Sequence, residues 1–109
     1  MKIQYTLQAL ADLEDIERYY GERAGAATAH NMVLRIMDTL ERLIALHPGA
    51  GRSRPDLDRN TRSIPVLPYV VFYEITRQRV SILRILHGHR DIRPPLASLL
   101  VAVSSPSSV

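Results

Sequence analysis

The amino-acid sequence predicts an α+β fold of order β-α-α-β-β-β, with a helical hairpin packed on one face of a largely antiparallel sheet. Residues 8–20 and 26–47 repeat apolar side chains at helical spacing, whereas residues 61–86 contain runs rich in β-branched and aromatic side chains. A segment rich in turn formers, residues 48–60, separates the two halves. A length of 109 residues with 46% hydrophobic content suits a single domain, expected over residues 1–100.

The first predicted element is a strand over residues 2–7, where apolar and polar side chains alternate. Thr6 is expected to cap the helix that follows over residues 8–20, because a hydroxyl at this position accepts a hydrogen bond from an early backbone N–H. Gly21 and Gly25 are expected to bracket a break after that helix.

A longer helix is predicted over residues 26–47, and Pro48-Gly49 ends it. Its apolar positions recur at intervals of three and four residues: Ala29, Val33, Ile36, Met37, Leu40, Leu43 and Ile44. Because the link between the two helices is short, they should form an antiparallel hairpin.

Residues 48–60 are predicted to be a loop, and three strands follow it, over residues 61–67, 69–75 and 80–86. Pro65 cannot donate to a ladder, so the first of these should be a bent or edge strand. A short polar connection makes the last two strands a hairpin. Residues 101–109 should be a frayed tail.

The strand over residues 69–75 is apolar on both faces. Its side chains divide into Tyr69, Val71, Tyr73 and Ile75 on one face and Val70 and Phe72 on the other. Two helices cover only one face of a sheet, so we expect part of the second face to be exposed unless residues 48–60 and 92–100 fold over it. An exposed apolar patch of this kind usually marks an interface with a partner.

Several classes of protein are excluded by composition. The sequence has no cysteine, which excludes disulfides and cysteine-bound metals. No run approaches the roughly 18 to 20 apolar residues that a membrane span needs, and no apolar signal region follows Lys2. We therefore expect a cytoplasmic protein without membrane contact.

Positive charge is concentrated in the second half of the chain. Residues 1–47 have a net charge of −2 and residues 48–109 a net charge of +5, and 13 of the 14 basic residues are arginine. This distribution indicates an anionic partner, either nucleic acid or an acidic protein, although genomic base composition would also enrich arginine.

The densest group of chemically active residues is the segment 84–91. Histidine can act as an acid or base near neutral pH, and arginine can stabilise a charged phosphorus centre. Such residues could cleave RNA or bind phosphate without reacting; the candidates are Arg62, Arg84, His87, His89 and Arg90. Arg84 lies between apolar neighbours and would need a partner if it is buried. His87 and His89 have no evident third ligand, so we expect no metal site.

Three groups of residues occur together in a characteristic order. They are Ala9, Asp12, Leu13, Ile16 and Tyr20 in the first helix, Leu40, Ile44, Pro48 and Gly51 at the end of the second, and Arg62, 69–73 and 82–91 in the strands. This combination resembles the RelE/ParE superfamily of bacterial toxins over roughly residues 2–93. The ending His87-Gly88-His89-Arg90-Asp91 is most similar to the ParE branch.

The resemblance implies a type II toxin that is neutralised by an antitoxin encoded beside it, ParD-like or related, whose C-terminal segment wraps the helical hairpin and the sheet. The residues expected to contact the antitoxin are Ile16, Tyr20, Met37, Tyr69, Val71 and Tyr73. Operator DNA would be reached only through the antitoxin. The resemblance implies no cofactor and no metal.

Two activities occur among such toxins: ParE-like members inhibit DNA gyrase, and RelE-like members are ribosome-dependent endoribonucleases. Lys2 is the only lysine, and Asp91 stands where a ribonuclease of this group often has an aromatic residue or a histidine. These departures favour a gyrase inhibitor over an enzyme. The alternatives are a ribosome-dependent mRNA endoribonuclease, for which Arg62, Arg84, His87 and His89 are suitable, and an inactive antitoxin-binding module.

Overall fold

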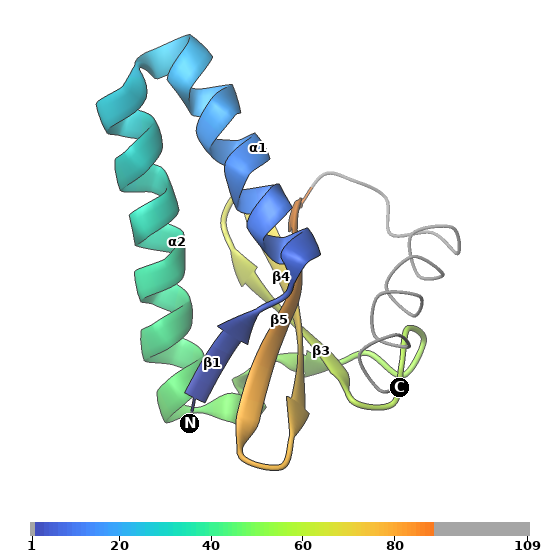
Figure 1. The fold of residues 1–109 in the computed structure, drawn as a ribbon. Coiled ribbons are helices and arrows are strands. Elements are labelled where there is room, and N and C mark those ends of the chain that lie inside the picture. Colours follow the sequence, from blue (N-terminus) through green and yellow to red (C-terminus); the bar gives the residue numbers. More distant parts are fainter. Residues whose placement is uncertain (1, 89–109) are drawn as a thin grey trace.

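The computed structural model describes residues 2–88, and it confirms the predicted order of helices and strands (Figure 1). The elements are β1 (Lys2–Tyr5), α1 (Leu7–Ala24), α2 (Ala26–Leu46), a 3-10 turn (Pro48–Ala50), β2 (Arg52–Ser53), β3 (Thr61–Val66), β4 (Tyr69–Thr76) and β5 (Arg79–His87). The predicted tail over residues 101–109 and the predicted domain end at residue 100 lie outside the described residues.

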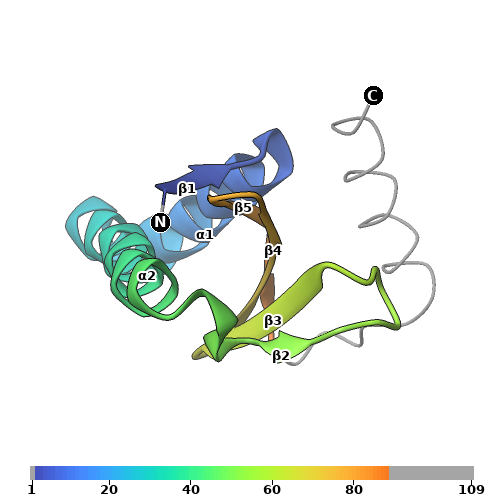
Figure 2. The same ribbon diagram turned by 90° about the horizontal axis from the view of Figure 1, so that it is seen from below.

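All five strands belong to one sheet, in the order β1-β5-β4-β3-β2. β1 runs parallel to β5, and the other pairs are antiparallel, so the sheet is largely antiparallel as predicted. The two helices pack on the same face of this sheet (Figure 2). Among residues 2–88, β1 lies at the edge of the sheet and pairs only with β5, so the first described strand depends on the last one for its ladder of hydrogen bonds.

The start of α1 is fixed by Thr6, as the sequence predicts. The Thr6 hydroxyl accepts a hydrogen bond from the Ala9 N–H at 3.1 Å and donates one to the Leu83 carbonyl at 3.0 Å. The helix therefore begins at Leu7, which is 80% exposed, and the expected strand over residues 2–7 ends earlier, at Tyr5.

The expected helix end at Gly21 is wrong, because α1 continues through this glycine to Ala24. A glycine inside a helix lowers the stability of the helix by only about 1 kcal/mol relative to alanine. The packing of the surrounding turns offsets this loss. The chain turns at Gly25 instead, where φ is +94°, a left-handed value that favours glycine.

The main core lies between the helices and the sheet. Its buried members are Ala9, Leu13, Ile16, Ile36, Leu40, Ile44, Ile64, Tyr69, Val71, Tyr73, Val80, Ile82 and Ile85. A bulge in β5 sets which side chains enter it: Phe72 pairs with Arg84 whereas Tyr73 pairs with Ile82, so Leu83 is an extra residue.

The opposite face of the sheet carries a second, smaller core of Leu57, Phe72, Leu83 and Leu86, with Val70 packed against it. Phe72 and Leu83 are at most 1% exposed, so the expectation of an exposed apolar sheet face is wrong for the described residues. The segment 48–60 was one of the two segments that could fold over this face, and its residue Leu57 is part of this cluster. Residues 92–100, the other such segment, lie outside the described residues.

The segment 48–60 contains more structure than the predicted loop. Its residues Arg52 and Ser53 form β2, which pairs with Ser63 and Arg62 of β3. The remainder of β3 has a neighbouring strand on one side alone, which is β4 in the described sheet. Pro65 lies in this part of β3, opposite Val70. The predicted edge character of the strand therefore applies at the proline. Neither helix of the described part is long and apolar enough to cross a bilayer.

One buried polar atom in the main core lacks a partner. The Tyr5 hydroxyl, at the end of β1, has no hydrogen bond among residues 2–88. Burial, with a smaller contribution from the charge of Glu41, raises the pKa of Tyr5 from 10.0 to about 12. The native state therefore holds the phenol proton more tightly than the unfolded chain does.

We expect Tyr5→Phe to raise the free energy of unfolding at pH 7 by about 1 kcal/mol, because it removes a buried hydroxyl that forms no hydrogen bond. The stabilisation from the raised pKa of Tyr5 is complete below pH 10 and is lost as the pH rises towards about 12, so the advantage of the variant should widen in that window. Urea unfolding at pH 7 and at about pH 11 measures both effects. Tyr19→Phe, at a side chain that is 50% exposed, is the control and should match the parent. Equal pH slopes for Tyr5→Phe and the parent would contradict the assignment.

Candidate functional site

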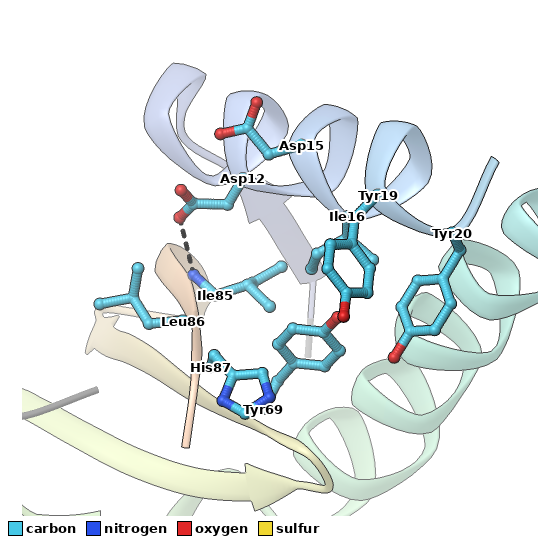
Figure 3. Close-up of a pocket in the computed structure, with 9 residues that line it drawn as sticks. All are labelled: Asp12, Asp15, Ile16, Tyr19, Tyr20, Tyr69, Ile85, Leu86 and His87. Atoms are coloured by element: carbon cyan, nitrogen blue, oxygen red, sulfur yellow. Dashed lines mark hydrogen bonds between the residues drawn. The ribbon is translucent and has the colours of Figure 1, made fainter. Parts of the chain in front are cut away.

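A pocket of about 370 Å³ opens between α1 and the ends of β4 and β5 (Figure 3). One face of α1 supplies Asp12, Asp15, Ile16, Tyr19 and Tyr20, β4 supplies Tyr69, and β5 supplies Ile85, Leu86 and His87. The five helical residues are spaced by three, one, three and one, so they lie on successive turns of the same face. This pocket brings together residues that are far apart in the sequence.

Asp12, which lines the pocket, forms an ion pair that joins α1 to β5. Arg84 Nε lies 2.8 Å from Asp12 Oδ2 and Arg84 Nη2 lies 3.0 Å from Asp12 Oδ1. The Ile85 N–H also donates to Asp12 Oδ2, at 2.9 Å. The Arg84 and Asp12 side chains are only 18% and 9% exposed, and the hydrogen bond with Asp12 is the main reason that the pKa of Arg84 is raised.

The partner that Arg84 was expected to need is therefore Asp12. This contact confirms the sequence-based expectation, but it also commits the guanidinium to a structural role. Its planar fork is filled by both oxygens of one carboxylate, a geometry that fixes α1 against β5. Asp12 was predicted to lie on the first helix, but it was not predicted to be the partner of Arg84.

One end of the pocket is aromatic. Tyr19 and Tyr20 meet edge to face with ring centroids 5.2 Å apart, and Tyr69 meets His87 in the same way at 5.7 Å. Burial, followed by a hydrogen bond with Tyr20, raises the pKa of Tyr69, so its phenol is neutral at physiological pH. Tyr19 is 50% exposed, and the Arg23 guanidinium lies 3.7 Å from its ring centroid.

These features suit the pocket to protein recognition. Tyrosine rings offer apolar area with a polar tip, and this combination is common where a partner inserts an anchoring side chain. The exposed ring of Tyr19 and the exposed carboxylate of Asp15 lie at the rim, where the Asp15 carboxylate is paired with Arg18 at 2.9 Å.

Arg62, another candidate, is also engaged within the fold. Its Nη1 donates to the Gly51 carbonyl at 2.8 Å and to the Gly49 carbonyl at 3.4 Å. The adjacent Tyr73 hydroxyl accepts from the Gly51 N–H at 2.8 Å and donates to the Pro48 carbonyl at 2.9 Å. Burial raises the pKa of Tyr73. Together Arg62 and Tyr73 anchor the turn that follows α2 onto the sheet.

The candidate catalytic residues are not gathered at one place in the described part of the chain. Arg62 pairs with Tyr73 and His87 pairs with Tyr69, so these two positions are four residues apart along β4, roughly 13 Å. Arg84 is held by Asp12, and His87 lies in the pocket beside Tyr69. His89 and Arg90 lie outside the described residues.

The residues expected to contact an antitoxin divide into two groups. Ile16, Tyr20 and Tyr69 line the pocket, and although Ile16 and Tyr69 also belong to the main core, they remain 6% and 5% exposed. Val71 and Tyr73 are 0% exposed, so in this conformation they offer no surface to a partner. Met37, on α2, is half-buried and packs against the same core. Asp15 and Tyr19 line the pocket but were not among the expected residues, although they lie on the same helical face as Ile16 and Tyr20.

Comparison with known proteins gives a consistent result. A family described as the ParE toxin of type II toxin–antitoxin system, parDE, matches residues 3–92. Toxin ParE1 of Caulobacter vibrioides is 36% identical over 89 residues, which are 82% of this chain and 91% of the relative. Toxin ParE3 of the same bacterium is 35% identical over 85 residues, 78% of this chain and 84% of the relative. A solved structure described as the chromosomal ParDE TA system from P. aeruginosa shares the fold, with a TM-score of 0.67, 24% identity, and coverage of 80% of this chain and 95% of that chain.

Proposed function

The chain belongs to the ParE toxin family of type II toxin–antitoxin systems, and from this premise we propose that a cognate ParD-like antitoxin neutralises it and that the free protein arrests growth by inhibiting DNA gyrase. The antitoxin is proposed to bind at the pocket between α1 and the ends of β4 and β5. Operator DNA would then be reached through the antitoxin in the neutralised complex, in the cytoplasm.

The observation that supports the antitoxin site is the aromatic end of the pocket. Half-buried Tyr20 and Tyr69, which is only 5% exposed, form the wall of the pocket, and Tyr19 at the rim is 50% exposed. A partner segment that inserts an apolar side chain there would bury the exposed ring area, and central tyrosines often dominate the energy of an interface. An ordering antitoxin segment could bury further surface along α1.

The engagement of two arginines within the fold weighs against the alternative of RNA cleavage by these residues. A ribonuclease of this size needs cationic groups that can turn towards a phosphate in the transition state. Arg84 is bound by both oxygens of Asp12, and Arg62 donates to two backbone carbonyls. Using either one for catalysis would require breaking contacts that hold the fold together.

Expression of the protein without its antitoxin tests the growth effect. We expect growth arrest, loss of supercoiling by purified gyrase in the presence of the protein, and intact messenger RNA. Rapid cleavage of translated messages would replace the gyrase proposal with the ribonuclease alternative. Unimpaired growth at a verified protein level would indicate an inactive antitoxin-binding module.

Tyr19→Ala tests the position of the antitoxin. Because the side chain is half exposed, the variant should fold normally, yet it should weaken binding to the product of the adjacent antitoxin gene by at least roughly tenfold, as expected for an interface tyrosine. Leu46→Ala, at a 72% exposed apolar residue at the end of α2, is the matched control. Calorimetric titration of both variants measures the difference. Equal affinities for Tyr19→Ala and the parent would show that the antitoxin binds elsewhere.

A further inference from the structure

The end of the sheet farthest from the pocket carries a hollow with a different chemistry. It lies between the start of β1 and the β4–β5 turn, it measures about 1230 Å³, and it is lined by Lys2, Gln4, Thr76, Arg77, Gln78 and Arg79. Along β5, His87 at the pocket and Arg79 at the hollow are separated by eight residues, roughly 26 Å. The two sites therefore lie at opposite ends of one strand.

Three cations in this hollow carry its charge. Lys2 and Arg79 are directly opposite each other in the β1–β5 ladder, and Arg77 is in the adjacent turn. Within residues 2–88, none of the three forms an ion pair, and no carboxylate lines the hollow. Glu74, the acidic residue in β4, does not contribute to the lining. Like charges placed together without a counterion repel each other, so an anion bound there would relieve that repulsion.

The backbone at Arg77 has a conformation that arginine rarely adopts. Arg77 has φ of +54°, in the left-handed region that glycine and asparagine occupy most easily. It is the first of two residues in the turn between Thr76 and Arg79, which pair with each other. Because the second turn residue, Gln78, does not share the positive φ, glycine is the usual residue at the first position of such a turn. Strained positions of this kind are concentrated at functional sites.

The composition of the lining distinguishes between classes of anionic partner. Every lining side chain is polar or cationic, whereas the centre of a protein–protein interface is usually apolar. Arginine, lysine, glutamine and threonine are the residues that contact phosphate and sugar oxygens in nucleic-acid complexes. We propose that this end of the sheet, through Lys2, Arg77 and Arg79, binds the phosphate backbone of nucleic acid. The proposal depends neither on the antitoxin site nor on gyrase.

Arg77→Gly gives a test in which stability and binding should change in opposite directions. Glycine adopts a positive φ without a steric penalty, so the urea midpoint of the variant should rise. Its affinity for a labelled 20-base-pair DNA duplex of mixed sequence should fall roughly tenfold at about 50 mM salt, and the slope of log affinity against log salt should fall by about one. Fluorescence anisotropy with the full chain measures both binding quantities.

Arg35→Gln is the control, because it removes one exposed arginine from the middle of α2 and changes the net charge equally. It should alter DNA affinity by less than about twofold, and Lys2→Gln combined with Arg79→Gln should weaken binding further than Arg77→Gly. Equal losses of affinity for Arg35→Gln and Arg77→Gly would mean that only net charge matters and would overturn the proposal. A preference for a polyglutamate chain over the duplex would overturn it in favour of an acidic polypeptide.

Discussion

Asp12→Asn should lower the free energy of unfolding by about 3 kcal/mol, because it leaves the Arg84 guanidinium without its counter-charge in a site that is largely closed to water. Asparagine keeps one side-chain oxygen, so the Ile85 N–H can retain an acceptor while Arg84 loses its carboxylate. The pair joins α1 to β5 across 72 positions of sequence. Its loss therefore weakens the attachment of the helical hairpin to the sheet.

Thermal and urea unfolding measure this effect. For a domain of this size, 3 kcal/mol corresponds to a fall in melting temperature of more than about 12 °C. Asp15→Asn is the matched control, since Asp15 lies one turn further along α1 and its ion pair with Arg18 is exposed at both side chains. That variant should change stability by less than about 0.5 kcal/mol. Similar stabilities for the two variants would contradict a structural role for the buried pair.

Gly51→Ala should destabilise the protein by about 3 kcal/mol, because the added methyl group has no room. A Cβ at this position would lie 2.3 Å from the Tyr73 hydroxyl oxygen and 2.7 Å from a carbon of its ring. The backbone of Gly51, with φ of −73° and ψ of 154°, is open to any residue, so the requirement is for space. Tyr73 is fully buried and would have to give up its hydrogen bonds with Gly51 and Pro48 to move.

Gly49→Ala separates this steric effect from the general effect of replacing a glycine. A Cβ at Gly49 meets nothing within 4 Å, so its variant should be close to the parent or slightly more stable. Urea unfolding of both variants, together with Tyr73→Phe, gives the comparison. Gly51→Ala and Tyr73→Phe disturb the same hydrogen bonds. The losses in free energy of unfolding of the two single variants should therefore add up to more than the loss of the double variant. Strict additivity would show that the Tyr73 hydroxyl does not anchor the turn.

The parts of the fold that could be predicted from the sequence are those with a local signal. The spacing of apolar residues identified both helices and the three long strands, and Thr6 identified the start of α1. The end of α1 was missed because Gly21 acts as a local signal for a break, whereas packing carries the helix past it. β2 was missed because two residues are too few to show a period.

The site was only partly predictable, because its geometry depends on contacts between distant elements. Ile16, Tyr20 and Tyr69 were among the expected partner residues and line the pocket, but Val71 and Tyr73, which share the face of β4 with Tyr69, are closed inside the core. Alternation along a strand predicts the face of the sheet on which a side chain lies, but it does not predict how deeply that side chain is buried. The predicted exposed sheet face is wrong because Leu57 packs on that face. Leu57 lies in a loop whose sequence has no periodic pattern, so its position could not be predicted.

The parallel pairing of β1 with β5 has a consequence for how the protein is made. β1 is translated before the other strands of the described sheet, and the strand with which it pairs among residues 2–88, starting at Arg79 opposite Lys2, is translated 77 residues later. Closing so long a segment costs chain entropy before any ladder bond forms, which delays this pairing relative to local contacts. The contacts of Thr6 and Asp12 with β5 also cannot form until β5 has been translated. A nascent chain that stalls before this strand emerges therefore has neither a complete sheet nor the pocket beside it.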